Sequence, residues 1–283
     1  MNLPVIRVEG TGIAETWEKS LIALWKEGID MPTEYDRPGI SPSKDASMVM
    51  VVNDPFAEPR IHLGFAGGIE DLEKYRQEVL EGVHDHWINP DEGKWTYTYH
   101  QRLFSYGLPW NNKPKINQIS YIVKKLSEAS CSRRAQAITW VPKYDPDTFD
   151  PPCLQRVWCR IYPGAEKQEY LAMHTHWRSR DAYRAAYMNI YGLTELQKEI
   201  CAMISQETGK SLLPGQYVDM IDSYHIYGES FPDFTERFLK MKQGREFYHI
   251  DRLKSRTMRS DDPAVLEGIL YGRQMLADER KKS

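Results

Sequence analysis

The chain has 283 residues, of which 41% are hydrophobic and 12% are aromatic, and its formal net charge is −3. This composition is typical of a globular protein and excludes a disordered or fibrous one. Such a charge gives no general attraction for nucleic acid or an anionic membrane, and no apolar run approaches the roughly 18 residues that span a bilayer. We therefore expect neither nucleic acid nor a membrane as a partner.

The four cysteines, Cys131, Cys153, Cys159 and Cys201, form no CxxC pair. In a chain of this length they do not indicate a disulfide framework. The first ten residues also lack the basic and apolar segments of a signal peptide. We expect a reduced, cytoplasmic setting.

In chain order, the first half of the sequence predicts one strand and two helices. β-Branched and apolar residues indicate a strand over Ala46–Val52. Apolar residues at helical spacing predict helices over Gly68–Gly82 and Ile116–Ser127.

The second half predicts three strands and a long helix. The predicted strands are Gln136–Val141, Leu154–Tyr162 and Tyr170–Trp177, and the helix is Tyr191–Thr208. Beyond Gly244 the chain is polar with scattered apolar residues, and we expect it to be mostly helical. No repeat or long linker divides the sequence. We expect one α/β (or α+β) domain over residues 1–283, with a divergent helical tail from about residue 242 to 283.

A proline- and aspartate-rich stretch, Pro142–Pro152, predicts a loop that ends directly at Cys153. From that position, before an apolar strand, a side chain can face a cleft. Arg156 and Arg160 follow closely, and a cationic surrounding lowers the pKa of a thiol and raises its thiolate fraction. Cys153 is the candidate nucleophile, although an inert core position is the commoner fate of a cysteine. The other three cysteines lie in apolar or helical patterns, where a structural role is favoured.

Three groups of arginines lie at predicted turns or element ends. A guanidinium offers a planar fork that suits phosphate oxygens, so the groups could together bind a dianion. The alternative is that each arginine is a solvated turn residue. The groups are Arg37, Arg133 with Arg134, and Arg178 with Arg180.

The motifs and their order resemble those of the thymidylate synthase family, particularly its archaeal-type and hydroxymethylase-like branches. The matching segments span about two-thirds of the chain. They are Asp36–Gly39, Tyr97–Gly107, Ser132–Trp140, Pro151–Leu154, Arg178–Asn189 and Ser223–Tyr227. The resemblance implies a mixed sheet flanked by helices, with one sheet face packed in a homodimer.

The resemblance also implies roles for individual residues. Cys153 would add to C6 of a pyrimidine nucleoside monophosphate. The phosphate would be bound by Arg37, Arg178 and Ser179, with Arg133 and Arg134 reaching across from a second subunit. Asn189 would bind the base, His225 and Tyr227 the sugar hydroxyl, and Asp181 would help to position base and folate.

The implied reaction is one-carbon transfer to C5 with 5,10-methylenetetrahydrofolate as co-substrate and no metal. A thymidylate synthase converts dUMP to dTMP because hydride from the folate gives a methyl group. Water in place of hydride would give a hydroxymethyl group, so a 5-hydroxymethylase acting on CMP, dCMP or dUMP is the alternative. A family member that only binds nucleotide or RNA ranks last, since Cys153 and the arginines are present.

Several positions depart from the family pattern. Leu154 follows the cysteine where many members have histidine, and Trp177 stands where glutamine is common. Tyr75 occupies the position of the general acid/base glutamate, so Glu78, one turn later, is the preferred carboxylate, with Glu73 behind it.

Two further features bear on the product and the base. The C-terminal segment differs from the family tail that closes over folate and excludes water, and this difference puts the methyl product in doubt. Asn189 instead favours uracil, because the related dCMP hydroxymethylases carry aspartate there.

Two histidine pairs, His84 with His86 and His174 with His176, could each supply two metal ligands. Neither pair has a third ligand at a telling distance, so we expect no metal.

Overall fold

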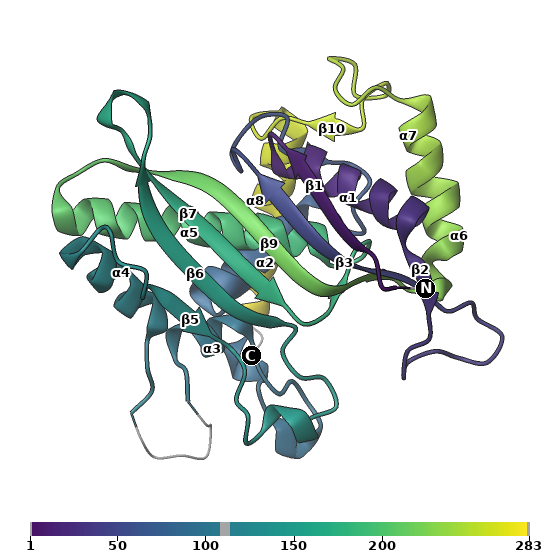
Figure 1. Cartoon of the computed structure of the whole chain (residues 1–283). Helices are drawn as coiled ribbons and strands as arrows, with labels where there is room; N and C mark the ends of the chain where they lie inside the picture. The colour runs from purple at the N-terminus through teal and green to yellow at the C-terminus, as the bar shows by residue number, and fades with distance from the viewer. Residues whose placement is uncertain (1, 108–113, 282–283) are drawn as a thin grey trace.

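The structure, a computed structural model, describes residues 2–107 and 114–281. Its centre is a mixed eight-stranded sheet with the order β1-β3-β9-β7-β6-β5, in which β2 pairs with β3 and β8 with β9 (Figure 1). The strands are β1 (Val5–Gly10), β2 (Ile29–Met31), β3 (Ser43–Val52), β5 (Gln136–Ile138), β6 (Leu154–Pro163), β7 (Glu169–Trp177), β8 (Arg180–Asp181) and β9 (Leu212–Ile226). The predicted mixed α/β architecture is confirmed.

Helices cover one face of this sheet. The longer helices in direct contact with it are α1 (Ile13–Glu27), α4 (Gln118–Glu128) and α5 (Ala186–Thr208). Helix α2 (Ile69–Glu81) packs on α5, and α8 (Pro263–Arg280) packs on α2 as an outer layer. The opposite face, turned toward the viewer in Figure 1, carries no helix within the described ranges. None of the helices described is long and apolar enough to cross a lipid bilayer.

The remaining elements are short. They are β4 (Ile61–His62), which pairs with β10 (Thr257–Met258), α3 (Tyr99–Phe104), α6 (Phe231–Asp233), a π-helical turn (Phe234–Leu239), α7 (Lys240–Gly244), and 3₁₀ turns at Asp85–Trp87, Pro90–Glu92, Asp145–Asp147, Ala165–Lys167 and Gly228–Ser230.

Alternation along the strands explains why the core lies on the helical side of the sheet. In β6, Val157, Cys159 and Ile161 are buried while the residues between them are more exposed. This is the period of two expected for a strand with one covered face. The inward residues meet apolar stripes on α1, α4 and α5, and together they form one continuous hydrophobic core.

The predicted helices and strands are confirmed, with shifted ends. Helix α5 begins at Ala186, five residues before the predicted start at Tyr191, because most of the residues before Tyr191 are also buried against the core. Strand β5 ends at Ile138 rather than Val141. The stretch that precedes Cys153 is a loop with one 3₁₀ turn.

The C-terminal segment is less helical than expected between α7 and α8. Residues 245–262 form turns and the short strand β10. Helix α8 then lies very close to α2, since a Cβ at Gly272 would be 2.6 Å from the carbonyl oxygen of Glu70. The Arg273 Nε donates to Glu73 Oε1 at 2.9 Å, which ties the two helices together.

A buried ionic network joins the C-terminal segment to α1. Glu18 accepts hydrogen bonds from His62 Nε2 at 3.0 Å and from Arg256 Nε at 2.5 Å. Burial alone would raise the pKa of Glu18, but these bonds outweigh it and lower the pKa to about 2. His62 is fully buried, and burial lowers its pKa, so it serves as a neutral donor to Glu18.

Replacing Glu18 should weaken the fold in a pH-dependent way. The folded pKa of Glu18, about 2, lies below its ordinary value of 4.5, so the carboxylate stabilises the fold above that ordinary value and this contribution is lost as pH falls toward 2. We expect Glu18→Gln to lower the free energy of unfolding at neutral pH by about 3 kcal/mol. Urea unfolding at several pH values measures the difference, which should shrink as the solution is acidified.

Glu236→Gln is the matched control, because Glu236 pairs with Lys240 at the surface. It should change the stability by less than about 0.5 kcal/mol at any pH. A difference between wild type and Glu18→Gln that stays constant from neutral to acid pH would contradict this assignment.

Candidate active site

The topology brings several predicted residues to one edge of the sheet. Strand β6 starts after Cys153, and its antiparallel neighbour β7 ends just before Arg178. Strand β9 runs parallel to β7 and ends at the same edge, near His225 and Tyr227. Residues that are distant in sequence therefore lie together around the start of β6.

Arg178 holds the loop that carries Cys153. Its Nε donates to the Pro152 carbonyl at 3.0 Å, its Nη2 donates to the Pro151 carbonyl at 2.6 Å, and its backbone N–H donates to the Cys153 carbonyl at 3.0 Å. These three bonds fix the backbone on both sides of the thiol.

The base of the same loop is anchored by a buried ion pair. Arg102 Nη2 donates to Asp145 Oδ1 at 2.7 Å, and both side chains are almost fully buried. Asp145 Oδ2 also accepts the Val141 N–H at 2.6 Å. The loop before Cys153 is thus fixed at both ends.

Cys153 is half-buried, and its protonation reflects opposing effects. Burial raises the pKa of the thiol, Asp150 adds to this, and Arg178 and Arg180 act against it. The thiol is therefore protonated at neutral pH in the ligand-free protein. The expected lowering of the thiol pKa by Arg156 and Arg160 is wrong, because the opposing charges come from Arg178 and Arg180 and burial outweighs them.

Arg37 lies on the predicted turn, with Gly39 at a φ of +85°. Together with Tyr35 and Tyr227 it lines a hollow of about 150 Å³. Burial is the main cause that raises the pKa of Tyr35, and Arg178 opposes the rise, which places Arg178 close to this group. Ser179 is half-buried next to Arg178.

Arg133 and Arg134 lie elsewhere in the same chain. They are exposed and line a separate hollow of about 530 Å³ with residues of α4 and β5. The register pairs Gln136 with Trp158, which is five residues along β6 from Cys153, or roughly 17 Å at the rise of an extended strand. These two arginines are not part of the group around Cys153 within one chain.

His225 is paired in register with an aspartate on each of two neighbouring strands. The register places Asp45 of β3 opposite it on one side and Asp181 of β8 on the other. Ser223 Oγ donates to Asp45 Oδ2 at 2.6 Å and contacts His225 Nδ1 at 3.3 Å. Burial lowers the pKa of His225, and its buried Nε2 has no partner within the described residues.

Tyr227 and Asp181 complete this part of the site. The Tyr227 ring lies 4.5 Å from the His225 ring. Asp181 Oδ1 accepts the Tyr183 and Arg184 N–H groups, so this carboxylate shapes the turn before α5. Burial raises the pKa of Asp181.

Asn189, in the first turn of α5, is buried between two partners. Its Nδ2 donates to the Tyr75 hydroxyl at 2.6 Å, and its Oδ1 accepts from Arg180 Nε at 3.4 Å. A Cβ at Gly192 would lie 2.8 Å from Tyr75 Cδ1, so this glycine makes room for the Tyr75 ring against α5. Tyr75 is thereby joined to the predicted base-binding residue.

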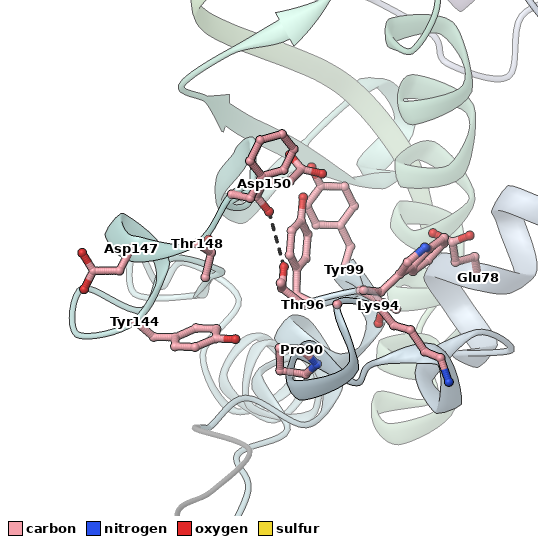
Figure 2. Close-up of a pocket in the computed structure, with 14 residues that line it drawn as sticks. Glu78, Pro90, Lys94, Thr96, Tyr99, Tyr144, Asp147, Thr148 and Asp150 are labelled. Carbon is pink, nitrogen blue, oxygen red and sulfur yellow. Dashed lines mark hydrogen bonds between the residues drawn. The ribbon is translucent and has the colours of Figure 1, made fainter. Parts of the chain in front are cut away.

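Glu78 lies one turn further along α2, on the wall of a cavity of about 660 Å³ (Figure 2). Burial raises the pKa of Glu78, while a 3.0 Å hydrogen bond to His84 Nδ1 opposes the rise. Glu73, in contrast, is held by Arg76 and Arg273 and serves the packing of α8 on α2.

The cavity extends from Glu78 on α2 to the loop before Cys153. In Figure 2, Glu78 lies on one side and Tyr144, Asp147 and Thr148 on the other, and Thr96 Oγ1 donates to the Asp150 carbonyl between them. Its aromatic lining consists of Trp95, Tyr97, Tyr99, Tyr144 and Phe149.

Tyr97 and Tyr99 connect this cavity to the thiol. Burial is the main cause that raises the pKa values of both hydroxyls, and the Cys153 sulfur contributes to each rise. Tyr99 also accepts the Leu154 N–H at 3.2 Å. The cavity wall is therefore contiguous with the candidate nucleophile.

Asp219 was not predicted as a site residue, and the suggestion that Arg180 could help to bind a dianion is wrong, because its guanidinium is buried against Asp219. Arg180 and Asp219 form a fully buried pair, with Nη1 and Oδ2 2.5 Å apart. The available signal was an aspartate within the apolar run Tyr217–Ile221, because a buried charge requires a partner. No group of three or more His, Cys, Asp or Glu side chains in the described part of the chain could hold a metal ion.

Comparisons with known proteins point to one family. The family model described as thymidylate synthase matches residues 63–265. A Methanosarcina mazei protein, provisionally named a thymidylate synthase, is 28% identical over 233 residues, which is 82% of this chain and 94% of that protein. A Methanocaldococcus jannaschii protein with the same provisional name is 28% identical over 236 residues, 82% of this chain and 95% of its own.

A solved structure shows the same fold. The thermostable thymidylate synthase A of Bacillus subtilis superposes with a TM-score of 0.58 at 21% identity, and the match covers 84% of this chain and 86% of that one. The match of a family model to well over half of the sequence, together with this shared fold, is sufficient for assignment. The chain belongs to the thymidylate synthase family.

Proposed function

We propose that this protein is a single-domain cytoplasmic enzyme that transfers a one-carbon unit from 5,10-methylenetetrahydrofolate to C5 of a pyrimidine nucleoside monophosphate, with dUMP to dTMP as the reaction. The observation that carries the proposal is the Arg178 clamp on the Cys153 loop, beside a cavity with aromatic walls. All four cysteines are free thiols, which is consistent with a reducing compartment.

Cys153 would act as the nucleophile. Addition of its thiolate to C6 of uracil turns C5, otherwise a poor nucleophile, into an enolate carbon. Since burial raises the pKa of the free thiol, its proton must pass to a base or to water before the sulfur attacks C6. The clamped loop holds the sulfur in place for this attack, which reduces its entropic cost.

The phosphate would bind among the arginines at the sheet edge. Arg178 uses Nε and Nη2 on the loop, and its Nη1 has no hydrogen bond to a protein group described in the structure. Arg37 and Ser179 would complete this part of the phosphate site. Charge-assisted bonds from guanidinium groups are suited to a dianion.

His225 and Tyr227 would bind the sugar. A buried imidazole nitrogen without a partner is costly unless a ligand satisfies it, and His225 Nε2 is such an atom. Asn189 would read the base and stabilise the charge that develops at O4. Asp181 would help to position the base and the folate through the turn that precedes α5.

Glu78 is the preferred proton-transfer group. It lines the cavity, and burial raises its pKa toward the range where a carboxyl group exchanges protons near neutrality. Tyr75 is committed to Asn189 and would take a positioning role.

The cavity fits the folate co-substrate. A volume of about 660 Å³ with several aromatic walls suits a flat conjugated ring system. Methylenetetrahydrofolate supplies the one-carbon unit and, for a methyl product, the hydride. The residues that line the cavity lie between Glu78 and Asp150 in the sequence, so none of them belongs to the C-terminal segment. Helix α8 of that segment is held on the outside of α2 and does not cover the cavity. That arrangement favours water entry and keeps a 5-hydroxymethylase acting on dUMP, dCMP or CMP as the second candidate.

A homodimer would complete the phosphate site. The sheet face without helices carries half-buried aromatic and apolar side chains, including Trp158, His174 and Met220, which suit a partner surface. Arg133 and Arg134 precede Gln136, which pairs with a residue of β6 well away from Cys153, so they would serve the site of the other subunit.

Turnover tests the reaction directly. Incubation with methylenetetrahydrofolate and dUMP should give dihydrofolate and a nucleotide with a methyl mass gain, and Cys153→Ser should lower kcat by at least roughly a thousandfold. Cys131→Ser, which alters an exposed cysteine, should keep wild-type activity. Tetrahydrofolate with a hydroxymethyl gain on dUMP, dCMP or CMP would support the second candidate instead. Absence of any product with all four of dUMP, dCMP, CMP and UMP would contradict both.

Mixing inactive variants tests the shared site. A subunit with Cys153→Ser can donate arginines to a partner that carries Arg133→Met and Arg134→Met but an intact Cys153. Random re-association of equal amounts should restore about a quarter of wild-type activity, because half of the dimers have one complete site. In the matched control, Cys153→Ser with Arg178→Met, no dimer gains a complete site. Activity that stays at the level of the separate variants in both mixtures would exclude arginine donation across the interface.

A further inference from the structure

The most deeply buried charges near the site lie beneath Asn189. Asp219, in the middle of β9, is 0% exposed, and Arg180 is 2% exposed. Besides Arg180, Asp219 accepts hydrogen bonds from Tyr217 at 2.7 Å, from Trp177 at 3.0 Å and from Thr175. The carboxylate is therefore fully satisfied and held at a fixed position.

Arg180 is fixed just as completely. Its Nη1 donates to Asp219, its Nη2 donates to the Ala186 carbonyl at 3.0 Å, and its Nε points at Asn189 Oδ1. The guanidinium also lies over the Trp177 ring, 4.1 Å from the centroid. Because all three of its nitrogens are hydrogen-bonded and its plane lies over a ring, the guanidinium cannot reorient when a ligand binds.

This restraint determines which way the Asn189 amide faces. A guanidinium has only donors, so the atom that faces Arg180 must be the carbonyl oxygen Oδ1. The amide nitrogen then faces the Tyr75 hydroxyl, as the 2.6 Å contact shows. A flip would place NH₂ against the buried guanidinium, donor against donor, and leave the Arg180 Nε proton unsatisfied.

The orientation matters because uracil and cytosine present opposite patterns. Uracil offers an acceptor at O4 and a donor at N3, whereas cytosine offers an amino donor at C4 and an acceptor at N3. An amide that is free to flip can pair with either base, so asparagine alone discriminates poorly. A locked amide accepts one pattern and rejects the other.

We propose that Arg180, held by Asp219, is the positioning residue that locks Asn189 and thereby selects uracil over cytosine. The inference rests on the proposed function and names the base that the site takes. The Asn189 nitrogen and the Tyr75 hydroxyl, which accepts from it and keeps its own proton to donate, together present donors. Donors suit the O4 carbonyl of uracil and oppose the amino group of cytosine.

The test compares dUMP with dCMP in binding and in kcat/KM. For the wild type, dCMP should bind roughly 10- to 100-fold more weakly, since the wrong base leaves a buried group unpaired. The double variant Arg180→Met/Asp219→Leu removes both charges, so no unpaired ion stays buried. In this variant the affinities for dUMP and dCMP should differ by no more than about threefold, because the amide can then flip.

Arg180→Lys provides a second variant if the double variant does not fold. Its ammonium can pair with Asp219 but cannot also restrain Asn189, so the ratio should fall here as well. The matched control is Arg60→Met/Glu195→Gln, which removes another buried pair, 2.5 Å apart, that stacks on Tyr191. The control should keep the wild-type ratio.

If Arg180 had a purely structural role, its replacement would weaken the binding of dUMP and dCMP equally and leave the ratio of their affinities unchanged. A folded Arg180→Lys or double variant with the wild-type ratio would therefore overturn the inference. A wild type that binds both nucleotides with equal affinity would overturn it too, while leaving the proposed function intact. A wild type that binds neither nucleotide would refute the proposed function and this inference with it.

Discussion

The site depends on the interaction between Arg178 and the loop before Cys153. Proline has no N–H, but the carbonyls of Pro151 and Pro152 still need donors, and Arg178 supplies both from the end of the adjacent strand. The same residue's backbone N–H binds the Cys153 carbonyl. One arginine therefore fixes the loop, lies beside the thiol, and opposes the effect of burial on the thiol pKa. The proposed phosphate site and the proposed nucleophile are joined through this single side chain.

A second set of constraints comes from the layer behind the site. Asp219 is buried in the sheet and holds Arg180, Arg180 restrains Asn189, and Asn189 binds Tyr75 on α2. Helix α2 is fixed in turn by α5 and α8. The C-terminal helix thus supports the helix that carries Glu78, which links the divergent tail to the cavity wall.

Much of this could be predicted from the sequence, because local patterns encode strand ends and loops. The loop before Cys153 and the strands that start and end beside it followed from proline content and alternation, and their shared edge follows from the pairing of β6 with β7. The arginine motifs could be predicted because they lie at the turns and element ends that local patterns encode. Helix α2 was also predictable, since its apolar residues recur at helical spacing.

Other features depend on contacts that no local pattern shows. The pair of Arg180 and Asp219 joins residues 39 positions apart, and only the fold reveals that both are buried. The commitment of Tyr75 to Asn189 depends on how closely α2 approaches α5 at Gly192. The rise in the pKa of Cys153 could not be anticipated either, because burial, which sequence does not report, outweighs the nearby arginines.

The most direct test of the central claim is a covalent bond between Cys153 and the nucleotide. A dUMP analogue with fluorine in place of the C5 hydrogen cannot lose a proton from C5, so the adduct formed with methylenetetrahydrofolate should persist through denaturation. Mass spectrometry of the digested protein should then locate the mass of both small molecules on the peptide that contains Cys153. A mass gain on a different residue, or no adduct in protein that turns over dUMP, would contradict the assignment of Cys153 as the nucleophile.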